Sequence, residues 1–477
     1  MLYVFISLGA VLLLLILVIL IRTLMFSNKI KDIKKDPLEI EQDDIVCKLG
    51  ELIKIKTVSH EDKDLIDFNV FQQYIDKVKE LYPLVFKACE FTQTNEYAIK
   101  LKLKGKSSDK PTVLMAHFDV VPVTEGWDLD PFLGEVVDGY LYGRGTLDTK
   151  NTMACALSAL EKALENNYIP KNDLYLCFGS NEEIYGDAQV KIVEQLKAEG
   201  VEPSLVFDEG GGILENAFPG VKEDIAFIGV VEKGMVNIKL SLDSNGGHSS
   251  TPRKNGPIIR LSKALTKLEK HPMKPKLINT SKEMLRVMGH HSSFGLKLIF
   301  ANMWLFKGLV KKLFTMLSAD TRALLTSTFA FTTINGGNQT NIIPNHVEAN
   351  INVRIAPFDT LDDVINHVRK VINDDEIKIT YSDVNKMYGE SDFNSEGYKI
   401  IKETTLETFD NVVVAPFIML GGTDARHYNE ISKCVLRFSP MKVTNEDRKG
   451  IHGLNEKIKV ENLKQCLEFY QRLLTKI

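Results

Sequence analysis

Acidic and imidazole side chains stand in this sequence at the points where short apolar runs stop. The run 112–116 leads directly into His117, and Asp119 follows two residues later, on the same side of an extended chain. Imidazole nitrogens and carboxylate oxygens are the ligands of hydrolytic zinc sites. A carboxylate has two oxygens, so one such residue can also bridge two ions and offset their repulsion. These residue types make metal-dependent hydrolysis a candidate chemistry.

Four further segments carry residues of the same types. They are Asp148 at the start of a predicted helix, the pair Glu182-Glu183, the pair Asp208-Glu209, and His452 near the C-terminus. Charged side chains at buried strand ends are costly unless they are paired or bind a metal. Each residue alone also fits a structural role, such as a hydrogen-bonded histidine, a helix cap or a solvated acidic surface. The pattern by itself leaves a metal site and a structural site open.

The segments that must position these residues alternate between strands and helices. Strands are expected at 112–116, 174–178 and 205–207, and helices at 151–166 and 187–198. This order predicts a layered α/β sheet. In such sheets, ligands gather at the carboxyl ends of the strands, which is where the candidate residues stand.

The pattern changes near residue 234. A strand at 235–242, a helix at 257–268, strands at 326–334 and 346–355, a helix at 361–371 and a strand at 377–381 follow in the ferredoxin-like order. The chain then returns to the α/β pattern. We therefore predict a discontinuous catalytic domain at 43–233 and 385–477, with an inserted α+β lid or dimerisation domain at 234–384.

The N-terminal 21 residues contain no charged side chain, and about 20 apolar residues suffice for a helix to cross a bilayer. An uncharged start that leads straight into Arg22 favours an uncleaved anchor over a signal peptide. We therefore predict a transmembrane anchor at 1–21 and a basic linker at 22–42. The linker's basic residues are Arg22, Lys29, Lys31, Lys34 and Lys35. The positive-inside rule then predicts a cytoplasmic catalytic domain.

The composition of the 477 residues excludes several classes of protein. Hydrophobic residues make up 44% of the chain, and 59 basic residues nearly balance 63 acidic ones. This composition is globular, and a net charge of -4 argues against a nucleic-acid partner. No glycine-rich phosphate-binding motif follows a strand, so a nucleotide cofactor is not expected.

Eight short strings resemble one known family. In chain order they are MAHFDVVP, YGRGTLDTK, GSNEE, FDEG, GGHSSTP, NIIP, GGTDAR and IHGLNE. They resemble the dinuclear-zinc metallopeptidases that include aminoacylases, acetylornithine deacetylase, glutamate carboxypeptidase and the Gly-Xaa carboxypeptidases. The resemblance covers roughly residues 40–477. It is closest to the branch of Gly-Xaa carboxypeptidases and N-acyl amino acid hydrolases, judging by GRGTLDTK, VVEKGM and NMWLF.

The resemblance implies two zinc ions, for which cobalt or manganese can substitute. The implied metal ligands are His117 and Asp208 for one ion, Glu183 and His452 for the other, and Asp148 as the bridge. Asp119 would orient His117 and fix its tautomer. Glu182 would be the general base that takes a proton from the attacking water.

The resemblance also assigns substrate contacts. His248 would stabilise the oxyanion, reaching across a dimer interface. The implied residues that hold the substrate carboxylate are Asn341, Arg354, Gly422 and Thr423, with Arg426 as a further candidate. A loop histidine and a surface salt bridge are the plain alternatives for His248 and Arg354.

Three functions remain open at this point. The first is a membrane-tethered hydrolase of carboxypeptidase or dipeptidase type that acts on a small peptide with a free carboxylate and forms a homodimer. The second is a hydrolase of N-fatty-acyl amino acids, and the third is a membrane-bound binding module without catalysis. The apolar segment 303–316, which contains Lys307, Lys311 and Lys312, fits a membrane contact, an acyl-chain tunnel, or core or dimer-interface packing within the second domain.

Overall fold

The computed structural model describes residues 1–26, 35, 37, 38, 40, 42–382 and 388–477. The basic residues Lys29, Lys31 and Lys34 lie outside this part of the chain, as does the predicted domain boundary at 384.

The largest sheet carries the strand ends that hold the candidate site. Its order is β1-β2-β6-β3-β7-β17-β9-β8-β18, with β16 paired to β9. The strands are β1 (Glu90–Gln93), β2 (Ile99–Leu103), β3 (Ser107–His117), β6 (Asn172–Gly179), β7 (Leu205–Asp208), β8 (Gly212–Leu214), β9 (Asp224–Glu232), β16 (Val412–Met419), β17 (Val435–Arg437) and β18 (Lys442–Val443). β3 lies between β6 and β7 and runs parallel to both. The carboxyl ends of these three strands therefore meet at one edge.

Helices cover both faces of this sheet, which explains why its central strands are apolar throughout. Leu114 faces the core that includes α5 (Lys150–Glu165) and α15 (Val460–Leu474), whereas Val113 and Met115 face the core beside α6 (Ala188–Ala198). The remaining helices of this part are α2 (Gln42–Ile53), α3 (Phe68–Leu81), α4 (Pro83–Ala88), α13 (Glu396–Thr408) and α14 (Asn445–Gly450). A small sheet of β19 (Lys457–Lys459), β5 (Tyr140–Tyr142) and β4 (Glu135–Val137) lies beside them.

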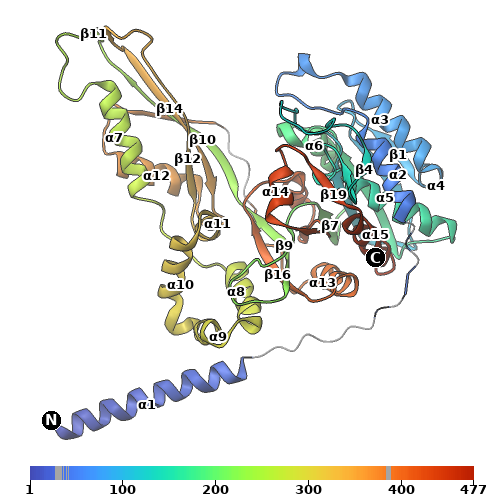
Figure 1. Cartoon of the computed structure of the whole chain (residues 1–477), viewed down its shortest axis with the longest axis horizontal. Helices are drawn as coiled ribbons and strands as arrows, with labels where there is room; N and C mark the ends of the chain where they lie inside the picture. Colours follow the sequence, from blue (N-terminus) through green and yellow to red (C-terminus); the bar gives the residue numbers. More distant parts are fainter. Residues whose placement is uncertain (27–34, 36, 39, 41, 383–387) are drawn as a thin grey trace.

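A second sheet is antiparallel and has its own core. Its order is β12 (Thr328–Gly336), β14 (His346–Ile355), β10 (Gly234–Asp243) and β15 (Lys378–Tyr381). Helices α7 (Pro257–Lys270) and α12 (Leu361–Ile372) pack against alternate buried side chains such as Val236 and Ile238. At the outer end of this sheet, β11 (Gly247–His248) pairs with β13 (Ile342–Ile343), far from the large sheet (Figure 1).

The chain between α7 and β12 forms α8 (Asn279–His291), α9 (Phe294–Ala301), α10 (Met303–Leu317) and α11 (Ala319–Ala323). The predicted boundaries assign these helices to the inserted domain. In the structure, α8 packs on β16, and Leu285 and Phe300 belong to the core of the large sheet. The apolar periodicity of a helix indicates that one face is buried, but not which sheet buries it.

One helix, α1 (Leu2–Met25), extends away from the body of the molecule (Figure 1). It is long and apolar enough to cross a membrane, and only Thr23 is buried within the protein. Its length, composition and position fit a membrane span or a signal sequence.

Candidate metal centre

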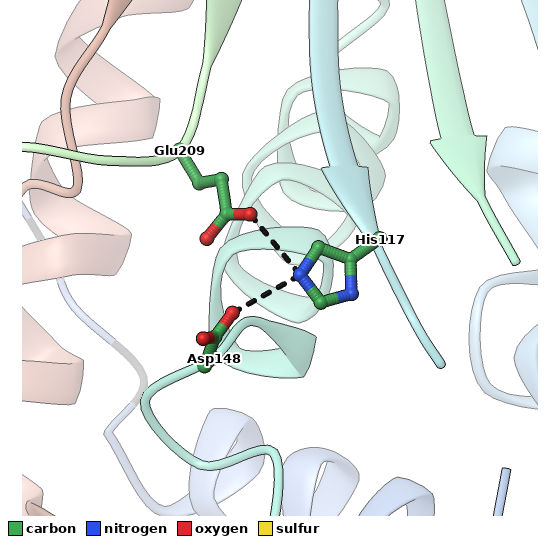
Figure 2. Close-up of side chains that lie close together, drawn as sticks. All are labelled: His117, Asp148 and Glu209. Atoms are coloured by element: carbon green, nitrogen blue, oxygen red, sulfur yellow. Dashed lines mark hydrogen bonds and ion pairs between the residues drawn. The ribbon is translucent and has the colours of Figure 1, made fainter. Parts of the chain in front are cut away.

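Three side chains from separate loops converge at the carboxyl edge of the large sheet. His117 ends β3, Asp148 precedes α5, and Glu209 follows β7. Figure 2 shows both carboxylates facing the same imidazole nitrogen. Nε2 of His117 lies 3.0 Å from Oδ1 of Asp148 and 3.1 Å from Oε1 of Glu209. Their candidate ligand atoms all lie within 4.8 Å of one another.

A second group of three shares Asp148 with the first. Nε2 of His452 lies 3.2 Å from Oδ2 of Asp148 and 2.9 Å from Oε2 of Glu183. The two oxygens of Asp148 therefore face two different histidines. A carboxylate in this position can bind one cation with each oxygen.

The charges at this edge fit divalent cations. Burial, followed by the charge of Asp148, raises the pKa of Glu209 to about 8. Hydrogen bonds to Asp148 and Glu183 raise the pKa of His452 to about 10. Burial opposes protonation of His117, but the carboxylates around it, Glu209 first, raise its pKa well above the usual value. Crowded carboxylates of this kind favour a positive charge between them, and imidazole and carboxylate are donors that zinc prefers.

Asp208 lies beside this cluster, and both of its carboxylate oxygens bond the backbone. Its Oδ2 accepts a hydrogen bond from the backbone N–H of Ala425 at 3.0 Å, and its Oδ1 accepts one from the N–H of Glu209 at 2.9 Å. Successive side chains of an extended segment point in opposite directions, so only one of this pair can face His117. The structure places Glu209 there, whereas the resemblance implies Asp208 as the ligand, and the metal-binding role of Asp208 stays a prediction.

Asp119 links the loops that follow β3 and β6. Its backbone oxygen lies 3.0 Å from Nδ1 of His117, which leaves Nε2 directed at the carboxylates. Its side-chain oxygens accept hydrogen bonds from the N–H groups of Glu182 at 3.1 Å and Glu183 at 3.2 Å. The hydroxyl of Ser59 donates a further bond to Asp119 at 2.8 Å. Asp119 is fully buried, so it holds these groups without competition from water.

Glu182 begins a short 3-10 turn, Glu182–Ile184, directly after β6. Burial raises the pKa of its carboxyl well above the usual range, and the neighbouring charges of Asp424 and Glu209 raise it further. The charge of His117 opposes this shift. A carboxyl with a raised pKa is suited to accept and return a proton near neutral pH.

Two residues that the sequence analysis did not single out hold the loop that presents Asp148. The buried carboxylate of Glu456 accepts hydrogen bonds from the N–H groups of Gly145, Leu147 and Asp148 at 3.1, 2.7 and 3.2 Å. Arg144 donates to the same carboxylate at 2.7 Å. Arg144 lies in the string YGRGTLDTK and Glu456 in IHGLNE. Their charges, so close in sequence to Asp148 and His452, were the signal by which the sequence could have identified them.

A cationic pocket lies next to the Glu182 turn. It is lined by Tyr185, Arg354, Gly422, Arg426 and Arg437, among other residues, and its volume is about 20 Å³. The guanidinium of Arg426 lies over the ring of Tyr185 at 5.4 Å. Thr423 borders the same loop and donates its N–H to Glu232 at 2.9 Å. Arg354 and Gly422 thus line one pocket beside the Glu182–Ile184 turn, and Thr423 follows Gly422 in the chain.

His248 and Asn341 do not reach the metal centre of their own chain. Both lie at the outer end of the second sheet, where the N–H of Ser249 donates to the oxygen of Asn341 at 3.1 Å. His248 is exposed, and its Nδ1 lies 2.8 Å from the hydroxyl of Ser250. Figure 1 shows the β11 end separated from the carboxyl edge of the large sheet.

The family model described as Peptidase family M20/M25/M40 matches residues 113–476. The chain belongs to this family. The probable carboxypeptidase S-like 2 of Dictyostelium discoideum is 33% identical to it over 476 residues, which cover 96% of this chain and 91% of that protein. The N-fatty-acyl-amino acid synthase/hydrolase PM20D1.1 of Danio rerio is 34% identical over 434 residues, covering 88% and 83%.

A solved structure of the M20 family shares the fold. The M20 family metallo-carboxypeptidase Sso-CP2 from Sulfolobus solfataricus superposes with a TM-score of 0.67 and 18% identity, covering 91% of this chain and 98% of that one. The predicted α/β, zinc-peptidase-like fold of the catalytic domain is therefore confirmed as that of the M20 peptidases. The chain is a carboxypeptidase-like hydrolase of the M20 family.

Proposed function

We propose that this M20 hydrolase cleaves the peptide or N-acyl amide bond next to an amino acid that has a free carboxylate. The observation that carries this proposal is the pair of ligand groups that share Asp148, with Glu182 buried beside them. Hydrolysis needs a site for cations, a base for water and a means of holding the substrate, and the structure contains side chains suited to each role.

The two ligand groups would hold two zinc ions, or cobalt or manganese in their place. His117 and Glu209 would bind one ion, Glu183 and His452 the other, and Asp148 both. When bound, such ions polarise the scissile carbonyl and lower the pKa of water from about 15.7 toward 7.

Glu182 would act as the base. Its carboxylate takes a proton from the attacking water and, once protonated, returns it to the leaving nitrogen. Asp119 positions this step, because it binds the backbone of Glu182 and also orients His117.

Arg354 supports selection of a free carboxylate. It lines the cationic pocket beside the Glu182 turn, together with Gly422 and Arg426. It forms no ion pair with any residue that the structure describes, so its planar guanidinium is available for two parallel bonds to a carboxylate. Thr423 would help to shape this subsite.

The remote position of His248 favours a homodimer. A histidine that stabilises the oxyanion must lie at the reacting carbonyl, and the β11 end of the same chain does not reach it. The second sheet of one subunit would instead deliver His248 and Asn341 to the metal centre of its partner.

Hydrolysis assays of the full chain in detergent test the main proposal. Dipeptides and N-acyl amino acids, each with a free or an amidated carboxylate, would be compared in the presence of zinc. We expect hydrolysis of the free acids alone, loss on chelation and recovery on adding zinc. Binding without hydrolysis in metal-loaded protein would instead support a non-catalytic binding module.

Cleavage of N-fatty-acyl amino acids is the second candidate function. It is favoured by the similarity to PM20D1.1 and by the exposed apolar surface of α1. The ratio of kcat/KM for a long-chain acyl amino acid and for a dipeptide with the same C-terminal residue decides between the two. A ratio far above one would make the acyl amide the preferred substrate.

We also propose that α1 anchors the protein in a membrane, with the catalytic body on the cytoplasmic side. Cys47 offers a direct test, because it is the exposed cysteine and the other five are buried. A membrane-impermeant thiol reagent should label Cys47 only after the cells are opened. Labelling in intact cells would place the body outside.

A further inference from the structure

Helix α10 has two apolar faces, and the fold uses only one of them. Val310 and Phe314 are buried in the core of the large sheet. On the opposite side, the exposed stripe consists of Leu305, Leu309, Leu313 and Met316. Met316 is 71% exposed, and Trp304 at the start of the helix is 52% exposed. A run of large apolar side chains along one exposed helix face marks an interaction surface.

The beginning of α10 is attached to the last turns of α1. Asn302 is fully buried, and its Nδ2 donates to the oxygen of Ile19 at 3.3 Å and to Oγ1 of Thr23 at 3.2 Å. Arg22 also donates to the oxygen of Ala301 at 3.4 Å. These bonds fix the place where α1 meets the body.

The length of α1 sets this junction at a particular depth. At about 1.5 Å per residue, the helix from Leu2 to Ile19 is about 27 Å long, close to the ~30 Å hydrocarbon thickness of a bilayer. A bilayer containing this part of α1 would have its surface at Asn302. In the view of Figure 1, α10 runs across the direction of α1 rather than along it.

Cationic side chains lie beside the same part of α10. Lys282, Lys307 and Lys311 line a groove of about 530 Å³ with Trp304. None of the three lysines forms an ion pair within the part of the chain that the structure describes. Lysines and a tryptophan next to an apolar helix face are the composition of helices that lie in a membrane surface.

We propose that α10 lies in the surface of the bilayer that α1 enters. Its exposed stripe contacts the acyl chains, and Lys282, Lys307 and Lys311 contact lipid phosphates. This inference rests on the proposed membrane anchor and not on the proposed reaction. Two attachments instead of one would hold the catalytic body in a fixed orientation, whereas a single helix would let it swing.

Tryptophan fluorescence tests the position of α10 directly, because the chain has two tryptophans. Trp127 lies over the Arg144 guanidinium near the metal centre, and Trp304 lies on α10. The full chain would be reconstituted into vesicles that contain phosphatidylserine, with phosphatidylcholine brominated on its acyl chains. We expect quenching relative to vesicles of unbrominated lipid, and loss of this quenching in Trp304→Phe.

The stripe provides the matching variants. Replacing Leu305, Leu309 and Leu313 by Glu should abolish the quenching of Trp304, whereas Ile169→Glu, at an exposed site in another part of the chain, should leave it unchanged. Hydrolysis of a water-soluble dipeptide should be the same in all variants, which separates this inference from the reaction. Equal quenching in the wild type and Trp304→Phe would overturn the proposal, as would failure of the protein to float with the vesicles. A dimer in detergent that the stripe variant dissociates, without quenching in vesicles, would assign the stripe to a second copy of the chain instead.

Discussion

The carboxyl edge of the large sheet and the outer end of the second sheet present their candidate catalytic groups in opposite ways. At the first, His117 is buried with its Nδ1 beside the backbone oxygen of Asp119, and the N–H of Asp148 is held by Glu456. At the second, His248 is exposed, and its ring bonds Ser250 of its own turn. The first arrangement is organised before substrate arrives, whereas the second would become part of a site only on meeting another surface. The candidate metal ligands and His248 therefore belong to two separate sheets.

Replacing the proposed base Glu182, at the carboxyl edge of the large sheet, should lower activity more than any other single change. Glu182→Gln should lower kcat by about 10³-fold or more, because it removes the carboxylate that would accept and return the proton. Metal content, measured by elemental analysis after gel filtration, should stay at two ions per chain. Glu194→Gln, on the exposed face of α6, is the control and should be silent. Retained activity in metal-loaded Glu182→Gln would remove this role.

His248→Ala tests whether His248 of one subunit completes the site that contains Glu182 of the other. Loss of an oxyanion donor should lower kcat about 10²–10³-fold. Coexpressing His248→Ala with Glu182→Gln should then restore activity far above either variant alone, since each mixed dimer has one complete site. The two variants would carry different affinity tags, so that mixed dimers can be purified by two successive affinity steps. The kcat of these dimers is then compared with that of each variant alone. Mixed dimers no more active than their parents would place His248 in another role.

The adjacent residues Asp208 and Glu209 at the carboxyl edge of the large sheet should differ in their effect on metal binding. Glu209→Gln should weaken one of the two metal sites by at least about 100-fold, because it removes a ligand charge. Asp208→Asn should keep both ions, since its oxygens bond the backbone instead. Isothermal titration of the chelated protein with zinc distinguishes them. Loss of an ion in Asp208→Asn alone would restore the assignment implied by the family resemblance.

The smallest effect is expected at the cationic pocket. Arg354→Met should raise KM for a free-acid substrate about tenfold, the value of one charge-assisted contact, and leave an amidated analogue unaffected. Arg369→Met, on the exposed side of α12, is the matched control. Steady-state kinetics with both substrates make the comparison, and an equal loss for the amide would exclude carboxylate recognition by Arg354.

The sequence predicted the parts of this site that depend on strand ends. His117, Glu182 and Glu183 follow apolar runs that the structure shows as parallel neighbours β3 and β6. The choice between Asp208 and Glu209 could not be predicted, because it depends on which way the chain is turned as it leaves β7. Glu456 was missed because a buried carboxylate that binds backbone N–H groups has no periodic signature.

For the second sheet and the helices near it, the sequence likewise predicts the order of the elements but not how distant elements pack together. The order of strands and helices around residues 234–381 could be read from alternating apolar patterns, and the structure has elements in that order. The packing of α8 against β16 could not, because contacts between distant segments are set by shape and not by local pattern. The lid and dimerisation roles of the second sheet stay predictions.

The bond between Asp148 and Glu456 joins residues 308 positions apart. During synthesis, the loop that presents Asp148 emerges from the ribosome long before Glu456 and its neighbour His452. The centre therefore cannot be completed until residues 452–456 have been made. A nascent chain that lacks residues 452–456 has no finished centre, so the order of translation delays the activity of this hydrolase until that segment has folded onto the Asp148 loop.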